Sequence, residues 1–180
     1  MTIDEIDRSI VAGGASHVVI TGGEPMLPVE IEALTRRIRE RGLHITIETA
    51  GTIDRDVECD LISISPKMSN STPTQGRAGD RWVERHERTR NSLAVVQSLI
   101  QRYDYQLKFV VVDEKDIEEL TKYCRSLDGL DNGKVLLMPE GIDEQEISSR
   151  EAWMKPICDE LGFVFCQRMH ILWYGNRRGT

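Results

Sequence analysis

The residues best suited to bind a ligand follow a run of β-branched residues near the N-terminus. In "VVITGGEPML" (residues 18–27) the apolar run ends at two glycines, a glutamate and a proline. Glycines lack a Cβ atom and let a ligand approach the backbone, whose carbonyls can accept hydrogen bonds from an ammonium group together with the Glu24 carboxylate. The alternative interpretation is a tight turn that happens to carry a charge. The stretch therefore predicts either a cation-binding turn or an ordinary turn at the end of a strand.

Polar segments of the same kind follow every strand-like run of the chain. These runs are rich in Val, Ile and Phe and cover residues 17–21, 44–49, 61–65, 107–112, 134–138 and 163–166. The segments at their ends are "TGGEP", "ETAGT", "SISPKMSNSTP", "VVVDEKD", "LMPEG" and "CQRMH". Ligands of parallel α/β folds bind where the strands end, so we expect several of these segments to contribute to one site.

Helical patterns separate the strand-like runs and define the fold class. They cover residues 3–12, 29–42, 89–103, 116–127 and 146–162, and Pro156 should kink or split the last one. Alternating helices and strands predict βαβ units, a parallel sheet and a single α/β domain over residues 1–180. The chain begins on a helix, whereas a helix that opens an α/β domain normally follows a strand. The irregular region from about Ser65 to Arg88 is long for a compact domain, which is typical of a functional or disordered loop.

Composition excludes several partners. The net charge of −7 argues against a nucleic-acid groove, because phosphate binding requires a basic surface. No apolar run approaches the roughly 18 residues of a membrane helix, so we expect no membrane partner. The cysteines are scattered without a CxxC pair, and buried thiols in a cytosolic protein are the favoured interpretation for Cys59, Cys124, Cys158 and Cys166.

These segments together resemble a known family. "TGGEP" after a strand resembles the motif with which radical S-adenosylmethionine (SAM) enzymes hold the methionyl amino group of SAM. "ETAGT", "SPK", "KFVV", "LMPEG" and the ending "RMHILWYGNRRGT" resemble 7-carboxy-7-deazaguanine synthase, in order from about residue 3 to Thr180. The most specific piece is the C-terminal pattern R-x-H-x-L-W-x-G-N-R-R-G.

The resemblance implies a fold and two binding sites. The fold would be a partial parallel (β/α) barrel of the radical SAM type that lacks its first strand. The residues implied for SAM binding are Gly22, Gly23, Glu24, Pro25, Glu48, Thr49, Gly51, Ser65 and Lys67. Those implied for binding of a pterin substrate are Arg168, His170, Arg177 and Thr180. No catalytic residue is assigned.

Each assignment has a plainer alternative. Lys67 can be a solvated loop lysine, His170 a packed core histidine, and Arg177 part of a solvated tail. Glu140 in "MPEG" fits an ordinary turn carboxylate better than a ligand. If the tail begins as a strand, Arg168 and His170 share one face by the two-residue period and can reach the same ligand.

The implied activity is that of a lyase in queuosine precursor synthesis. It is the radical ring contraction of 6-carboxy-5,6,7,8-tetrahydropterin to 7-carboxy-7-deazaguanine, a 7-deazapurine, with loss of ammonia. In the family SAM works with a [4Fe–4S] iron–sulfur cluster and magnesium (Mg²⁺), and the enzyme is a cytoplasmic homodimer. The cofactor carries the chemistry, and the protein supplies orientation and exclusion of water.

One departure from the family is large. The family holds its cluster with a CxxxCxxC loop, which this sequence lacks, and its cysteine spacings of 65, 34 and 8 cannot form one loop. We therefore expect an N-terminally shortened chain with no metal ligands of its own, unable to bind the cluster and inactive alone, with a doubtful Mg²⁺ site. Two alternatives stay open: another radical SAM activating or maturation enzyme, and a cluster-less binding module.

Overall fold

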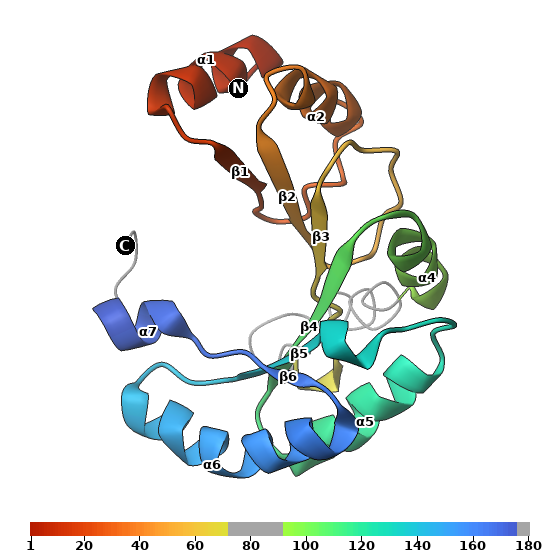
Figure 1. The fold of residues 1–180 in the computed structure, drawn as a ribbon, viewed down its shortest axis with the longest axis vertical. Helices are drawn as coiled ribbons and strands as arrows, with labels where there is room; N and C mark the ends of the chain where they lie inside the picture. The colour runs from red at the N-terminus through yellow and green to blue at the C-terminus, as the bar shows by residue number, and fades with distance from the viewer. Residues whose placement is uncertain (72–91, 176–180) are drawn as a thin grey trace, which may run out of the picture. The chain divides into compact units, whose positions relative to one another are not determined.

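A computed structural model describes residues 1–71 and 92–175 of the chain. Six strands form one sheet in chain order, β1-β2-β3-β4-β5-β6, with helices between them (Figure 1). This alternation confirms the predicted α/β class. The described residues divide into two compact units, the first made of residues 1–65 and 92–106 and the second of residues 66–71 and 107–175.

The first unit builds three parallel strands and their helices. Its elements are α1 (Ile3–Gly13), β1 (His17–Ile20), α2 (Ile31–Arg39), β2 (His44–Thr49), β3 (Leu61–Ile64) and α4 (Leu93–Arg102). Helix α1 starts at a capping box in which Thr2 and Glu5 satisfy each other's backbone N–H groups. The Asp7 carboxylate in α1 accepts two hydrogen bonds from Arg41, which follows α2. This ion pair fastens α1 to α2.

The hydrophobic pattern explains the core of the first unit. Side chains in β2 alternate, so that Ile45 and Ile47 are fully buried between half-buried neighbours. The predicted stripe of α2 is confirmed, because Ile31, Leu34 and Ile38 are all buried. Parallel registers pair Ile20 with Ile47 and Thr49 with Ile64. Because the pairings are parallel, the carboxyl ends of β1, β2 and β3 lie at the same edge.

The second unit continues the strand–helix alternation. Its elements are η1 (Ser69–Ser71), β4 (Tyr105–Val111), α5 (Glu114–Arg125), η2 (Asn132–Lys134), β5 (Val135–Pro139), α6 (Glu144–Leu161), β6 (Val164–Phe165) and α7 (Met169–Tyr174). The first two residues of β4, Tyr105 and Gln106, belong to the first unit. Strands β4, β5 and β6 pair in parallel, and α5 and α6 run along the same side of them (Figure 1).

Two sequence predictions about this unit need correction. Of the two effects expected of Pro156, a kink or a split, the split does not occur, because α6 is one helix from residue 144 to 161. Proline removes the hydrogen bond to the carbonyl of Ala152, but both residues are exposed, so water can solvate that carbonyl. The tail does not begin as a strand either. "MHILWY" forms the short helix α7, and only Ile171 of it is buried.

The described helices include none that is both long and apolar enough to cross a membrane. All four cysteines are free; Cys124 and Cys158 are buried as predicted, while Cys59 and Cys166 are half-buried. Part of the predicted irregular region and the end of the tail, residues 72–91 and 176–180, lie outside the described residues.

Candidate functional site

The Glu24 carboxylate lies at the carboxyl ends of β1 and β2. The turn before it needs two glycines, because Gly22 and Gly23 have φ angles of 99° and 51°. One carboxylate oxygen of Glu24 accepts hydrogen bonds from the Met26 N–H at 3.1 Å and the Thr49 hydroxyl at 2.6 Å. The half-buried carboxylate is therefore held firmly in the first unit.

The second carboxylate oxygen of Glu24 extends this network to the turn after β2. It accepts hydrogen bonds from the Ala50 N–H at 3.0 Å and from the Thr52 hydroxyl at 3.3 Å. Glu24 thus joins two strand ends rather than simply projecting from one. A cation at this carboxylate would compete most easily with Thr52, whose bond is the longest of the four and whose hydroxyl can rotate.

The turn after β2 is fixed by Thr49 and Gly51. The Thr49 hydroxyl, which donates to Glu24, accepts the Gly51 N–H at 3.0 Å. Gly51 has a φ of 71°, and a Cβ atom there would lie 2.8 Å from methyl groups of Ile64 and Val96. Thr49 is only 4% exposed. Thr49 and Gly51 therefore shape the turn, while a ligand would meet its outer surface.

The remaining residues predicted for SAM divide between the units. Glu48 is half-buried and accepts a hydrogen bond from the Thr21 hydroxyl at 3.2 Å. The Ser65 N–H donates to the Thr49 carbonyl at 2.8 Å, which places Ser65 at the end of β3 beside β2. Pro25 is buried under the turn. Lys67 is exposed and belongs to the second unit. The structure thus brings together Glu24, Glu48, Thr49, Gly51 and Ser65.

The pterin residues predicted from the tail do not share one strand face. Arg168 is the half-buried residue that precedes α7, and His170 is an exposed residue within that helix. Neither residue belongs to a strand, so the two-residue period of a strand does not apply to them. His170 is not a core histidine either. Arg177 and Thr180 lie outside the described residues.

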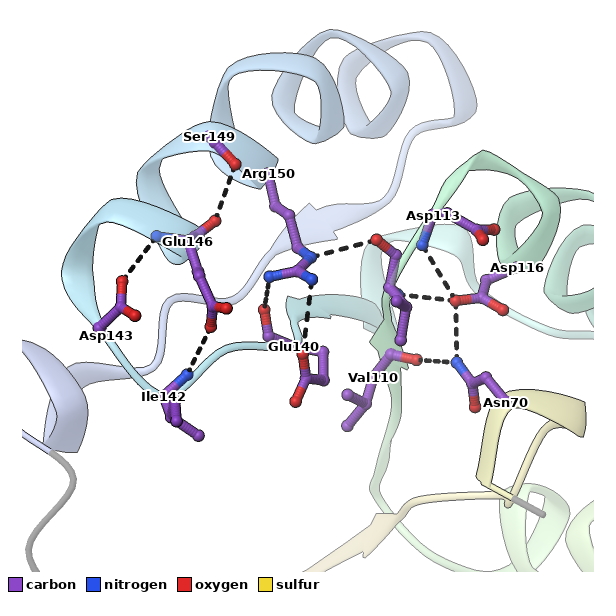
Figure 2. Close-up of polar contacts among 11 residues, drawn as sticks. Asn70, Val110, Asp113, Asp116, Glu140, Ile142, Asp143, Glu146, Ser149 and Arg150 are labelled. Atoms are coloured by element: carbon purple, nitrogen blue, oxygen red, sulfur yellow. Dashed lines mark hydrogen bonds and ion pairs between the residues drawn. The ribbon is translucent and has the colours of Figure 1, made fainter. Parts of the chain in front are cut away.

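The sequence did not predict a polar network that lies at the ends of β4 and β5. Arg150 of α6 donates hydrogen bonds to the carbonyls of Val112 at 3.1 Å and Glu140 at 2.7 Å (Figure 2). The Asp116 carboxylate accepts from the Val112 N–H at 2.7 Å and from the Asn70 side chain at 2.8 Å. The only signal for it was the polar segment after each strand, because Arg150 is one of many charged residues on an amphipathic helix.

The cysteines present do not fit an iron–sulfur cluster. Such a cluster needs thiolates, and burial raises the pKa of Cys59 to about 11, of Cys124 to about 12 and of Cys158 to about 11. Burial also raises the pKa of Cys166. Within residues 1–71 and 92–175, no three His, Cys, Asp or Glu side chains are grouped so that they could hold a metal ion.

Two solved structures share the fold of this chain. QueE from Escherichia coli matches with a TM-score of 0.65 and 22% sequence identity, over 93% of this chain and 64% of that chain. SuiB from Streptococcus suis, solved bound to S-adenosylmethionine, matches with a TM-score of 0.61 and 13% identity, over 93% of this chain and 42% of that chain. The fold is therefore that of the radical SAM enzymes, as the sequence predicted.

Sequence relatives specify the family. The chain is 38% identical to the 7-carboxy-7-deazaguanine synthase of Rhodopirellula baltica, over 99% of this chain and 69% of the relative. It is 36% identical to that of Halobacterium salinarum, over 96% of this chain and 71% of the relative. No protein-family model matches the chain. The chain belongs to the 7-carboxy-7-deazaguanine synthase family, which confirms the resemblance found in the sequence.

Proposed function

We propose that this protein binds SAM and 6-carboxy-5,6,7,8-tetrahydropterin and serves the ring contraction of the pterin to 7-carboxy-7-deazaguanine, with loss of ammonia. The observation that carries the proposal is the Glu24 carboxylate, held by four hydrogen bonds at the ends of two adjacent parallel strands. The product, 7-carboxy-7-deazaguanine, would be used in the synthesis of queuosine precursors.

The turn after β1 suits the amino acid end of SAM. Gly22 and Gly23 are both exposed and carry no side chain that would cover their carbonyls, so an ammonium group can reach those carbonyls together with Glu24. A charge-assisted bond to the carboxylate would replace the weakest internal bond, that from Thr52. Glu48 and Ser65 would line the neighbouring part of the site in the first unit. When bound, SAM would supply the 5′-deoxyadenosyl radical that abstracts a hydrogen atom from the substrate, after one-electron reduction by the [4Fe–4S] cluster.

The C-terminal segment would bind the pterin. The buried Nε atom of Arg168 has no hydrogen-bond partner among the described residues, and the exposed imidazole of His170 is accessible to a ligand. A guanidinium group pairs well with a planar carboxylate such as that on C6 of the substrate. Arg177 and Thr180 would add to this site. Because Arg168 precedes α7 and is half-buried whereas His170 lies within α7 and is exposed, we assign them to different edges of the substrate.

Activity would need cluster ligands that residues 1–180 do not contain. The sequence has no CxxxCxxC segment, and the four cysteines present do not fit a cluster. We therefore propose that this chain binds both small molecules but does not turn over by itself, and we assign no Mg²⁺ site to the described residues. The same observation favours one second function, a cluster-less binding module. The resemblance in the sequence further supports a cytoplasmic homodimer. Sedimentation of the purified chain would test whether it forms a dimer.

Turnover measured anaerobically tests the proposal. Residues 1–180, and the same chain preceded by the CxxxCxxC segment of a relative, would each be supplied with iron, sulfide, a reductant, SAM and the pterin. Mass spectrometry should detect 7-carboxy-7-deazaguanine only with the chain that carries the added CxxxCxxC segment. Product from residues 1–180 alone would refute the need for added thiolates. If neither chain forms product and neither binds the pterin, the proposed function is wrong.

A further inference from the structure

The segment that follows Glu24 is held by an arginine from another loop of the first unit. Arg55 lies in the loop between β2 and β3, and its Nε atom donates a hydrogen bond to the Met26 carbonyl at 3.1 Å. Its Nη2 atom donates to the Leu27 carbonyl at 3.4 Å. The Met26 N–H in turn donates to the Glu24 carboxylate at 3.1 Å. Arg55 and Glu24 therefore bind the same short stretch of backbone.

The half-buried guanidinium of Arg55 bonds to backbone and not to a carboxylate. Within residues 1–71 and 92–175, no acidic side chain forms an ion pair with it, and its hydrogen bonds go to the two carbonyls after Glu24. Burial does little to hold that part of the chain, because Leu27 is 66% and Val29 61% exposed. The bonds from Arg55 are therefore what fastens the end of this segment to the loop after β2.

The backbone around Arg55 is itself fixed by the end of α4. The Tyr103 hydroxyl donates to the Arg55 carbonyl at 3.3 Å and accepts the Val57 N–H at 3.2 Å. Arg102, the last residue of α4, forms an ion pair with the Asp54 carboxylate next to Arg55. Contacts on both sides of Arg55 in sequence thus set the place from which its side chain reaches out. The guanidinium is positioned without help from a ligand.

We propose that Arg55 is a positioning residue for the Glu24 carboxylate in the binding of SAM. This inference rests on the proposed function. Glu24 can meet an ammonium group only while its carboxylate stays at the ends of β1 and β2, and the Met26 N–H is one of the four donors that keep it there. Without Arg55, the carbonyls of Met26 and Leu27 lose their donors and the segment can move. Arg55 thus acts through Glu24 and not by contact with SAM.

The test measures by calorimetry the affinities for SAM and for 5′-methylthioadenosine, which lacks the amino acid end of SAM. Arg55→Met should weaken SAM binding by about 10-fold and leave methylthioadenosine binding unchanged. This is the lower end of the roughly 10- to 100-fold range for a hydrogen bond to a charged group, because Glu24 is displaced but not removed. Arg55→Lys can still donate to one carbonyl and should restore part of the preference for SAM. Arg36→Met, an exposed residue of α2, is the matched control and should retain both affinities.

A double-mutant cycle tests whether Arg55 acts through Glu24. In a chain that carries Glu24→Gln, adding Arg55→Met should change SAM affinity by less than about 2-fold, because the positioned charge is already gone. If Arg55→Met fails to fold, Arg55→Lys is compared with the wild type in the same cycle.

Three results overturn the inference and leave the proposed function intact. They are an unchanged preference for SAM in the Arg55 variant, equal losses for both ligands as a merely structural role would give, and a full loss of SAM affinity that persists beside Glu24→Gln. A wild-type chain that binds neither ligand overturns the proposed function itself.

Discussion

Replacing Gly51 by alanine tests how tightly the candidate SAM site is built. A Cβ atom in the left-handed conformation of this residue, with φ at 71°, costs about 1–2 kcal/mol. The same atom would lie 2.8 Å from methyl groups of Ile64 and Val96, and overpacking of this kind costs about 1–3 kcal/mol more. We therefore expect Gly51→Ala to lower the free energy of unfolding by about 2–5 kcal/mol, the sum of the two ranges.

Urea denaturation of Gly51→Ala beside Gly42→Ala separates the two contributions. Gly42 has almost the same φ, 70°, but no atom within 4 Å of its hypothetical Cβ, so its variant should lose only the backbone part. Because the Gly51 N–H donates to Thr49, which in turn donates to Glu24, Gly51→Ala should also weaken SAM binding. Equal destabilisation of the two variants would refute the close packing of Gly51 against β3 and α4.

Two further predictions concern ionisable groups. The hydrogen bonds from Arg41 lower the pKa of the Asp7 carboxyl, so its stabilisation is present at neutral pH and is lost as the pH falls below about 4, through the folded-state value. Acid titrations should therefore show a smaller fall of unfolding free energy for Asp7→Asn than for the wild type, and parallel curves would contradict this. Burial raises the pKa of Cys124 to about 12 and of Cys158 to about 11, so at pH 8 both should react with a disulfide reagent about 100-fold or more slower than in the urea-unfolded chain. Rapid reaction of either thiol in the folded chain would show that it is accessible as thiolate.

Hydrophobic periodicity was sufficient to predict the strands, most helices and the edge of the sheet at which the candidate residues lie. The buried stripe of α2 and the alternation in β2 leave few alternatives, because both periods run over several residues. The "HILW" run was too short to distinguish a strand from a helix, and the structure makes it α7. Local patterns of this length do not decide between the two conformations.

Contacts between distant segments could not be predicted in the same way. "TGGEP" indicated a ligand-binding carboxylate, but the partners of Glu24 at Thr49 and Thr52 follow it by more than 20 residues. Arg150 likewise contacts Val112 across 38 positions of sequence. Such contacts depend on which strand ends become neighbours, and the sequence predicted only that polar strand ends would gather at one edge.

Calorimetry with SAM and 5′-methylthioadenosine tests the central claim most directly, because the second compound lacks the amino acid end of SAM. The wild-type chain should bind SAM more tightly. Glu24→Gln should weaken SAM binding by about 1.5–3 kcal/mol, the usual value of a hydrogen bond to a charged group, and should leave methylthioadenosine binding unchanged. Glu30→Gln, an exposed residue at the start of α2 that makes no capping hydrogen bond, should change neither. Equal losses for both ligands in Glu24→Gln, or no loss for SAM, would contradict the claim that Glu24 holds the SAM ammonium group.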